Sequence, residues 1–283
     1  MTNFLAIDQG TTSTRAVLFD KSLNVVKICN EKLNSSFPNP GWVEQEPLKI
    51  LQSVKNTINK IASTDVVGIG ITNQRETVVI WDRSTGSPIY NAIVWQDRRT
   101  AVHCDEMKKM GYERFIKEKT GLLLDPYFSA TKICWILDNV PNAREDSENG
   151  KLAFGTIDSF LLWHLTNGRV HATDATNASR TMLYNILEGC WDTELLKLFN
   201  IPESILPLVK DNLSDFSETS IIGKNVPIRV MIGDQQAAAI GLGCFKSGMI
   251  KATFGTGCFT LLNTGHAPKK SQFNLITTIA YQF

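Results

Sequence analysis

The segment Asp8-Gln9-Gly10-Thr11-Thr12-Ser13-Thr14-Arg15 decides the fold, because it joins two strands through a turn rich in hydroxyl groups. The stretches 4–8 and 15–20 on either side have the pattern of β-strands. Glycine lets backbone N–H groups approach an anion closely, and serine and threonine hydroxyls can donate to phosphate oxygens. These residues favour a phosphate-binding hairpin, in which Asp8 could hold the water shell of a Mg²⁺ ion. An ordinary hydroxyl-rich hairpin has the same residues, so the segment alone leaves both interpretations open.

The sequence beyond this hairpin predicts an α/β fold. A third strand is expected at 25–29, and an amphipathic helix begins at Pro47, with apolar residues at spacings of three and four. A buried strand at 66–71 follows, and further helices are expected at about 98–110, 129–138 and 156–165. Polar stretches at 140–150 and 200–227 are expected to be surface connections. Three strands, a helix and another strand, followed by helices, predict a mixed sheet flanked by helices.

A second glycine turn echoes the first one near the end of the chain. A strand is expected at 228–232, followed by a turn at 233–236 and a helix that begins at Ala237. The stretches 249–254 and 258–263 then flank Gly255-Thr256-Gly257. Two glycine and hydroxyl hairpins of this kind could grip a polyphosphate from opposite sides.

Composition excludes several classes of function. The 283 residues are 43% hydrophobic and 20% charged, which suits a globular protein with a sizeable core. The 29 basic and 28 acidic side chains leave a net charge of +1, so no overall field attracts nucleic acid or an acidic membrane. The six cysteines form no Cys-x-x-Cys pair, and no apolar run approaches the ~18 residues of a membrane span. We expect a cytoplasmic protein without a nucleic-acid or membrane partner.

Other polar and aromatic residues are candidates for chemistry. Arg75 and Glu76 follow a predicted strand and together offer donors and an acceptor to neighbouring hydroxyls, although a surface ion pair is the alternative. Asp234 lies between a predicted strand and a helix, where a carboxylate could accept a proton or merely cap the helix. Trp95 and Phe259 offer flat faces to a carbon chain, whereas isolated aromatic residues more often belong to a core.

Several motifs resemble those of one kinase family. The first hairpin resembles the phosphate loop of the actin, hexokinase and Hsp70 ATPase superfamily, which implies an actin-like (ribonuclease H-like) fold. Within it, Tyr127-Phe128-Ser129-Ala130-Thr131-Lys132-Ile133-Cys134-Trp135-Ile136-Leu137-Asp138-Asn139 is similar to a signature of the FGGY carbohydrate kinases. Four segments resemble the glycerol kinases of that family: Asn73-Gln74-Arg75-Glu76-Thr77, Ile93-Val94-Trp95-Gln96-Asp97-Arg98-Arg99-Thr100, Gly233-Asp234-Gln235-Gln236 and Gly255-Thr256-Gly257-Cys258-Phe259.

The resemblance implies transfer of a phosphoryl group from ATP to glycerol, with ATP and Mg²⁺ as cofactors, and with Asp234 as the general base. It implies that glycerol is held by Arg75, Glu76, Trp95, Tyr127, Asp234, Gln235 and Phe259. It implies that the nucleotide phosphates are held by Thr11, Thr12, Ser13, Arg15 and Thr256, and that Asp8 positions Mg²⁺ through water. The segment 174–181 is expected to be a loop near the cleft, without an assigned role for any of its residues.

The resemblance also implies two domains. Residues 1–242 are expected to form the glycerol-binding N-terminal domain, and residues 243–283 the first hairpin of a truncated second actin-like domain that binds nucleotide. The chain stops inside an expected strand at 276–283, and full-length glycerol kinases are nearly twice as long. Since the adenine contacts of the family would lie outside this chain, we expect weak ATP binding and little kinase activity from the chain alone.

The sequence also bears on regulation and on the choice of substrate. The segment 221–228 lacks the glycine and arginine loop through which many bacterial glycerol kinases bind a sugar bisphosphate, so inhibition through that loop is not expected. The resemblance implies that the full-length protein self-associates. Two alternatives stay open: a pentulose or other sugar kinase of the same family, and a non-catalytic polyol-binding remnant.

Overall fold

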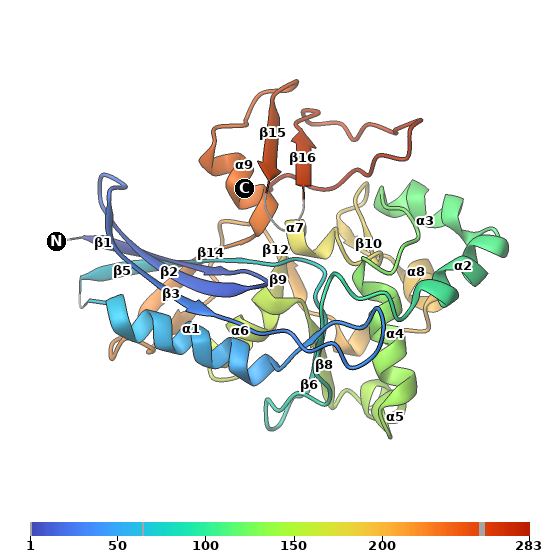
Figure 1. Ribbon diagram of the computed structural model, residues 1–283, viewed down its shortest axis with the longest axis horizontal. Helices are drawn as coiled ribbons and strands as arrows, with labels where there is room; N and C mark the ends of the chain where they lie inside the picture. The colour runs from blue at the N-terminus through green and yellow to red at the C-terminus, as the bar shows by residue number, and fades with distance from the viewer. Residues whose placement is uncertain (1, 64, 255–257) are drawn as a thin grey trace.

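A six-stranded mixed sheet in the order β13-β14-β5-β1-β2-β3 organises the computed structural model, which describes residues 2–63, 65–254 and 258–283 (Figure 1). The strands are β1 (Asn3–Gln9), β2 (Ser13–Asp20), β3 (Val25–Lys32), β5 (Val66–Asn73), β13 (Glu218–Thr219) and β14 (Val226–Gly233). Strands β1, β2 and β3 form an antiparallel meander, whereas β5 and β14 run parallel to β1. The carboxyl ends of β1, β5 and β14 therefore lie at the same edge of the sheet.

The register of these three parallel strands makes them end at the same level. Gln9 at the end of β1 faces Asn73 at the end of β5, and Gly233 at the end of β14 faces Asn73 from the other side. The segments that leave the strands therefore begin side by side. In open α/β sheets, ligands bind beyond the carboxyl ends of the strands.

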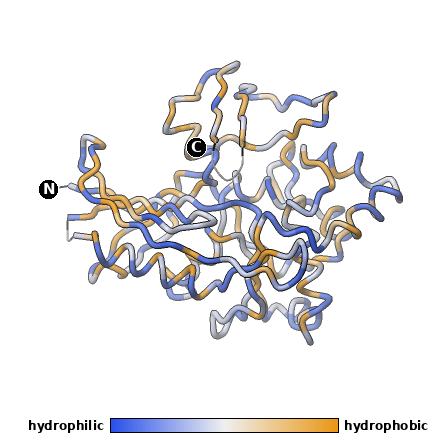
Figure 2. The backbone as a smooth tube through the Cα atoms, in the orientation of Figure 1, coloured by the Kyte–Doolittle hydropathy of each residue, from blue (hydrophilic) through white to orange (hydrophobic). Residues whose placement is uncertain are grey.

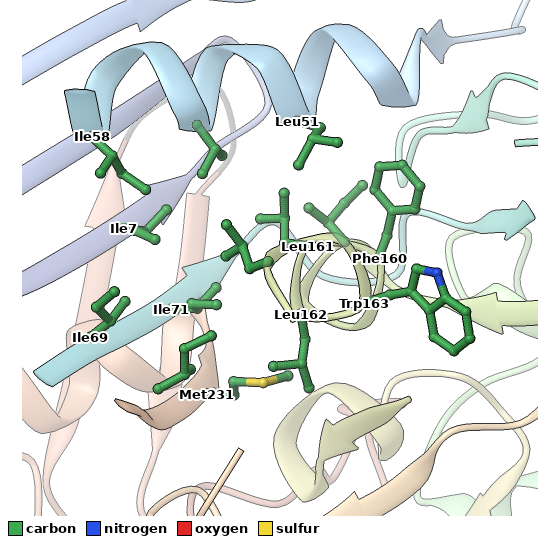
Figure 3. Close-up of a cluster of buried hydrophobic side chains, with 14 of the residues drawn as sticks. Ile7, Leu51, Ile58, Ile69, Ile71, Phe160, Leu161, Leu162, Trp163 and Met231 are labelled. Atoms are coloured by element: carbon green, nitrogen blue, oxygen red, sulfur yellow. The ribbon is translucent and has the colours of Figure 1, made fainter. Parts of the chain in front are cut away.

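Helices α1 (Pro47–Ile61) and α6 (Ile157–Leu165) lie on one face of the sheet (Figure 1). Helix α1 begins with proline, which suits a first helical position, and it buries an apolar stripe against β2 and β3. Figure 3 shows Ile58 and Leu161 of these helices directed toward Ile7 and Ile71 of the sheet. Figure 2 shows that hydrophobic residues recur along the central strands, as burial of this face requires.

A second apolar core lies beside the sheet, among helices packed against a short β-ladder. The helices are α2 (Ala101–Lys109), α3 (Tyr112–Thr120), α4 (Ser129–Asn139), α5 (Ala143–Glu148) and α8 (Thr193–Leu198), and the ladder pairs β6 (Val79–Asp82) with β8 (Leu152–Gly155). The other short elements are β4 (Glu44–Gln45), β7 (Ala92–Ile93), β9 (Ala172–Asp174), α7 (Ala175–Ala178), β10 (Tyr184–Asn185), β11 (Cys190–Trp191), η1 (Glu203–Ile205) and β12 (Leu208–Lys210).

Helix α9 (Asp234–Gly241) and the hairpin of β15 (Ile250–Phe254) and β16 (Cys258–Leu262) project from the carboxyl edge of the sheet (Figure 1). The hairpin is a separate two-stranded sheet. Within the described ranges, no helix combines the length and the apolar character that crossing a bilayer requires.

The predicted fold class is confirmed, since the sheet is mixed and flanked by helices. Five local predictions are wrong. The connection expected at 200–227 contains η1, β12, β13 and the start of β14, because β12 pairs with β9 and β13 pairs with β14. The loop expected at 174–181 contains helix α7, which Asp174 caps. Helix α9 begins at Asp234 rather than Ala237, because Gly233 is extended and already serves as its N-cap. Residues 143–148 of an expected connection form α5, which buries Ala143 and Ser147 one turn apart. Residues 276–283 do not form the expected strand. Their backbone hydrogen bonds go to loops instead of a neighbouring strand, since the Thr277 N–H donates to the carbonyl of Gly121 just after α3.

Candidate active site

A cavity of about 160 Å³ opens at the carboxyl edge of β1, β5 and β14. Ten residues line it: Thr11, Thr12, Arg75, Glu76, Trp95, Tyr127, Asp234, Gln235, Thr253 and Phe259. Every residue predicted to hold glycerol is among them. Two larger hollows, of about 230 and 310 Å³, lie elsewhere and contain no predicted site residue among those the structure describes.

Asp234 and Arg75 face each other across this edge. The Nε atom of Arg75 lies 3.0 Å from Oδ1 of Asp234, but its N–H does not point at the oxygen, so the contact is an ion pair rather than a hydrogen bond. The Arg75 side chain is only 3% exposed and donates through Nη1 to Gln236 Oε1 at 3.2 Å. A Cβ atom on Gly233 would lie 2.6 Å from Arg75 Cδ, so the glycine makes room for this arginine.

The surroundings of Asp234 favour proton acceptance. Burial raises its pKa above the ordinary value of 3.8, the positive charge of Arg75 lowers it, and the negative charges of Glu76 and Asp8 raise it again, with a net upward shift. The backbone N–H of Gln235 donates to Asp234 Oδ1 at 2.6 Å and orients the carboxylate. A carboxylate with a raised pKa is a stronger base than one in water, which is what a proton-accepting role needs.

Glu76 is held by a buried arginine that sequence reasoning did not single out. Its backbone has φ +62°, a left-handed conformation that costs a non-glycine residue energy and is typical of functional sites. Arg180 Nε donates to Glu76 Oε1, and both side chains are at most 4% exposed. The Arg180 guanidinium also lies 5.4 Å from the ring centre of Tyr127. Because 104 residues separate Arg180 from Glu76, no local spacing indicates the pair.

Three aromatic side chains form the apolar wall of the cavity. Trp95 meets Tyr127 edge-on with ring centres 5.6 Å apart, and meets Phe259 in the same way at 6.0 Å. The indole Nε1 of Trp95 donates to Thr11 Oγ1 at 2.8 Å, which ties the wall to the first hairpin. Burial raises the pKa of Tyr127 to about 12, so its hydroxyl stays protonated.

The first hairpin brings only part of its predicted phosphate set into the cavity. Thr11 and Thr12 line it, whereas Ser13 and Arg15 lie on the adjoining strand β2. The Gly10 N–H donates to the Ser13 carbonyl at 2.9 Å and closes the turn. Thr256, predicted for the same phosphates, lies outside the described residues.

Asp8 is the one predicted magnesium residue. Its carboxylate is 40% exposed, lies 3.6 Å from Arg15 Nη1 and stands at the end of β1, next to the hairpin. Partial burial raises the pKa of Asp8, and the charge of Arg15 opposes the rise. Within the described ranges no three His, Cys, Asp or Glu side chains are grouped to hold a metal directly. A single accessible carboxylate fits an ion that keeps most of its waters.

A buried lysine also reaches the site from β15. The Nζ atom of Lys251 donates to Gln235 Oε1 at 2.6 Å, and the residue is only 3% exposed. Burial lowers the pKa of Lys251, whereas the negative charge of Asp234 raises it. The sequence offered no signal for this contact, since Lys251 alternates with apolar neighbours like any surface residue of a strand.

Comparisons with known proteins identify the family of the chain. Residues 3–241 match the N-terminal domain of the FGGY family of carbohydrate kinases. Glycerol kinases of Nitrosomonas eutropha and Rhizobium meliloti are each 54% identical over 98% of the chain, which spans 57% and 58% of their lengths.

Solved structures of kinases also match the chain. The crystal structure of Plasmodium falciparum glycerol kinase with ADP matches with a TM-score of 0.96 and 41% identity, over 100% of this chain and 58% of that one. A ligand-bound xylulose kinase from Lactobacillus acidophilus matches with a TM-score of 0.83 at 21% identity, over 91% of this chain and 53% of that one, which shows the fold alone. The chain thus spans less than three fifths of the length of these relatives.

Proposed function

The chain belongs to the FGGY family of carbohydrate kinases, as its motifs predict, and from this premise we propose that it is the glycerol-binding part of an ATP-dependent glycerol kinase. The observation that supports the proposal most is the position of Asp234, whose carboxylate shares one cavity with Arg75, Glu76 and the hydroxyl-rich hairpin. Residues 1–242 are the glycerol-binding domain in this proposal, and residues 243–283 begin a nucleotide-binding domain.

In the proposed reaction, a terminal hydroxyl of glycerol gives its proton to Asp234 while its oxygen bonds to the γ-phosphorus of ATP. The bond between that phosphorus and the bridging oxygen breaks, and ADP leaves with the electron pair. The products are glycerol 3-phosphate and ADP. The protein mainly positions the reactants and accepts the proton, as is general for phosphoryl transfer.

The cavity divides into a polar and an apolar side that match a polyol. Arg75 donates hydrogen bonds to hydroxyl oxygens, and Glu76, paired with Arg180, accepts from hydroxyl protons. Trp95, Tyr127 and Phe259 cover the carbon side of glycerol.

The proposed phosphate contacts come from Thr11, Thr12, Ser13 and Arg15 of the first hairpin, together with Thr256. Asp8 holds the water shell of Mg²⁺ in this proposal. When bound, the ion would neutralise negative charge on the phosphates of ATP.

The test of the proposal is replacement of the base. The Asp234→Asn variant should lower the rate of ADP release with glycerol by on the order of 10²–10⁴-fold, because its amide cannot accept the proton. Turnover is measured with the chain and with a chimera that adds the C-terminal remainder of the Nitrosomonas eutropha relative. The matched control is Asp215→Asn, whose side chain is 72% exposed and pairs with Arg229 on the surface. Near-normal turnover of Asp234→Asn with an unchanged pH profile contradicts the assignment.

A second candidate is a polyol-binding segment that transfers no phosphate by itself, which is favoured because the cavity gathers every residue proposed to hold glycerol but, among the residues that the structure describes, only Thr11 and Thr12 of those proposed to hold phosphate. Calorimetry with glycerol, run with and without ATP, separates the two. Glycerol binding by the chain without ADP release supports the second candidate, and ADP release by the chain alone supports the first.

A further inference from the structure

We propose that Lys251 is a positioning residue, which fixes the side-chain amide of Gln235 so that its N–H donors face the substrate cavity. The inference rests on the proposed function, and it specifies that Gln235 offers hydrogen-bond donors to the ligand of that site. It concerns a residue that lines no part of the cavity itself but contacts one that does.

The burial pattern of β15 singles out Lys251. The strand reads Ile-Lys-Ala-Thr-Phe, and its lysine is 3% exposed whereas Ile250 and Phe254 are 65% and 83% exposed. Lysine is almost never this buried unless it is paired. Burying an ammonium group is costly unless it is paired, so packing alone does not explain the lysine.

In the contact between Lys251 and Gln235, only Lys251 can be the donor. Nζ of Lys251 lies 2.6 Å from the Gln235 amide, and a lysine ammonium carries donors and no acceptor. The atom that faces Lys251 must therefore be the oxygen Oε1. This argument settles the orientation of the amide, which its shape alone leaves ambiguous.

The other end of the amide is left for the substrate. Gln235 lines the cavity, and its Nε2 has no hydrogen-bond partner in the part of the chain that the structure describes. Donors at Gln235 and Arg75 thus stand beside acceptors at Glu76 and Asp234. A hydroxyl can accept from one side and donate to the other, so this pattern favours alcohols and orients the one that gives its proton to Asp234.

The experiment is a double-mutant cycle on glycerol affinity, measured by calorimetry on the whole chain. We expect Lys251→Met to bind glycerol roughly three- to tenfold more weakly, since the freed amide no longer holds its donor toward the ligand. The double variant Lys251→Met/Gln235→Ala should bind no more weakly than Gln235→Ala alone, because Lys251 acts through Gln235. The matched control Lys246→Met, at an exposed lysine just before β15, should bind like the unaltered chain.

Three other results would contradict the inference. If the losses of the two single variants add, Lys251 only supports the hairpin and the inference is wrong. If Lys251→Met binds as well as the unaltered chain, the inference is again wrong, while the proposed function stands. If neither the unaltered chain nor Lys246→Met binds glycerol, the proposed function itself fails and takes the inference with it.

A second variant covers the case in which Lys251→Met does not fold, as judged by thermal unfolding. In Gln235→Glu, Lys251 keeps an oxygen to pair with, but the atom that faces the cavity becomes an acceptor. We expect this variant to fold and to bind glycerol at least about tenfold more weakly. Affinity equal to that of the unaltered chain would show that Gln235 offers no donor to glycerol.

Discussion

Ion pairs between distant residues hold the side chains of the candidate site. Arg180 and Glu76 are 104 residues apart, and Arg75 and Asp234 come from the ends of two different strands. The Arg180, Glu76 and Arg75 side chains are at most 4% exposed, so water cannot replace a lost partner of these charges, whereas the Asp234 side chain is 33% exposed. Glu76, which touches the substrate in our proposal, therefore depends on Arg180, which does not.

Replacement of Arg180 tests this dependence. We expect Arg180→Met to destabilise the chain by about 3–5 kcal/mol, because it leaves the Glu76 carboxylate buried without its partner. Urea unfolding and glycerol calorimetry measure the effect. The control Arg229→Met removes an ion pair whose side chains are 51% and 72% exposed, and should change stability little. An equal cost for the two variants would contradict the argument, and partial recovery in Arg180→Met/Glu76→Gln would support it.

A buried polar network connects the elements behind the site. Asp158 of α6 accepts from Thr173 Oγ1 at 2.6 Å, and Asp174, which caps α7, accepts from Asn177 Nδ2 at 2.7 Å. Thr176 of α7 in turn accepts from the Gly233 N–H at 2.9 Å, one residue before Asp234. The network thus anchors the end of β14, which carries the proposed base.

This network should make stability depend on pH. Burial, and then the charge of Asp174, raises the pKa of Asp158 from 3.8 to about 7. An acid whose folded pKa is raised stabilises the fold fully below its unfolded pKa, and that contribution is lost as pH rises through the folded pKa. Stability should therefore fall between pH ~4 and pH ~7.

The variant Asp158→Asn keeps an uncharged group of the same shape and should remove most of this loss. We expect it to be more stable than the unaltered chain at pH 8, by on the order of 3 kcal/mol, and to differ little at pH ~4, where Asp158 is still protonated in the folded chain. Urea unfolding at the two pH values measures the difference. The control Asp105→Asn, at a side chain that is 66% exposed, should follow the unaltered chain. The same pH dependence in all three proteins would rule out Asp158 as its source.

Periodic elements could be predicted from the sequence, and contacts between distant elements could not. The stripe of α1 and the alternation of β1, β2 and β5 are local patterns, so their positions hold to within a few residues. Strand-end polar residues such as Asp234 could also be predicted, because parallel strands deliver such residues to one edge. Arg180 and Lys251 could not, since only the folded chain shows what their side chains meet.

The whole fold does not decide the substrate. Xylulose kinases share it with TM-scores of 0.83 and below, at 22% identity or less. One fold of this kind hosts several substrates, so the choice lies in the side chains of the cavity. Here the aromatic wall narrows a cavity of about 160 Å³, with Trp95 and Phe259 in edge contact at 6.0 Å.

This wall should admit three carbons and crowd out five. We expect the chain to bind glycerol at least about 100-fold more tightly than D-xylulose, because the longer sugar must displace an aromatic ring. Phe259→Ala should weaken glycerol binding and narrow that ratio, since it removes one side of the wall. Calorimetric titration of both ligands measures the ratio, with Phe273→Ala, at a side chain 84% exposed, as the matched control. A preference for D-xylulose in the unaltered chain would favour the sugar-kinase alternative, and an unchanged ratio in Phe259→Ala would place the selectivity elsewhere in the cavity.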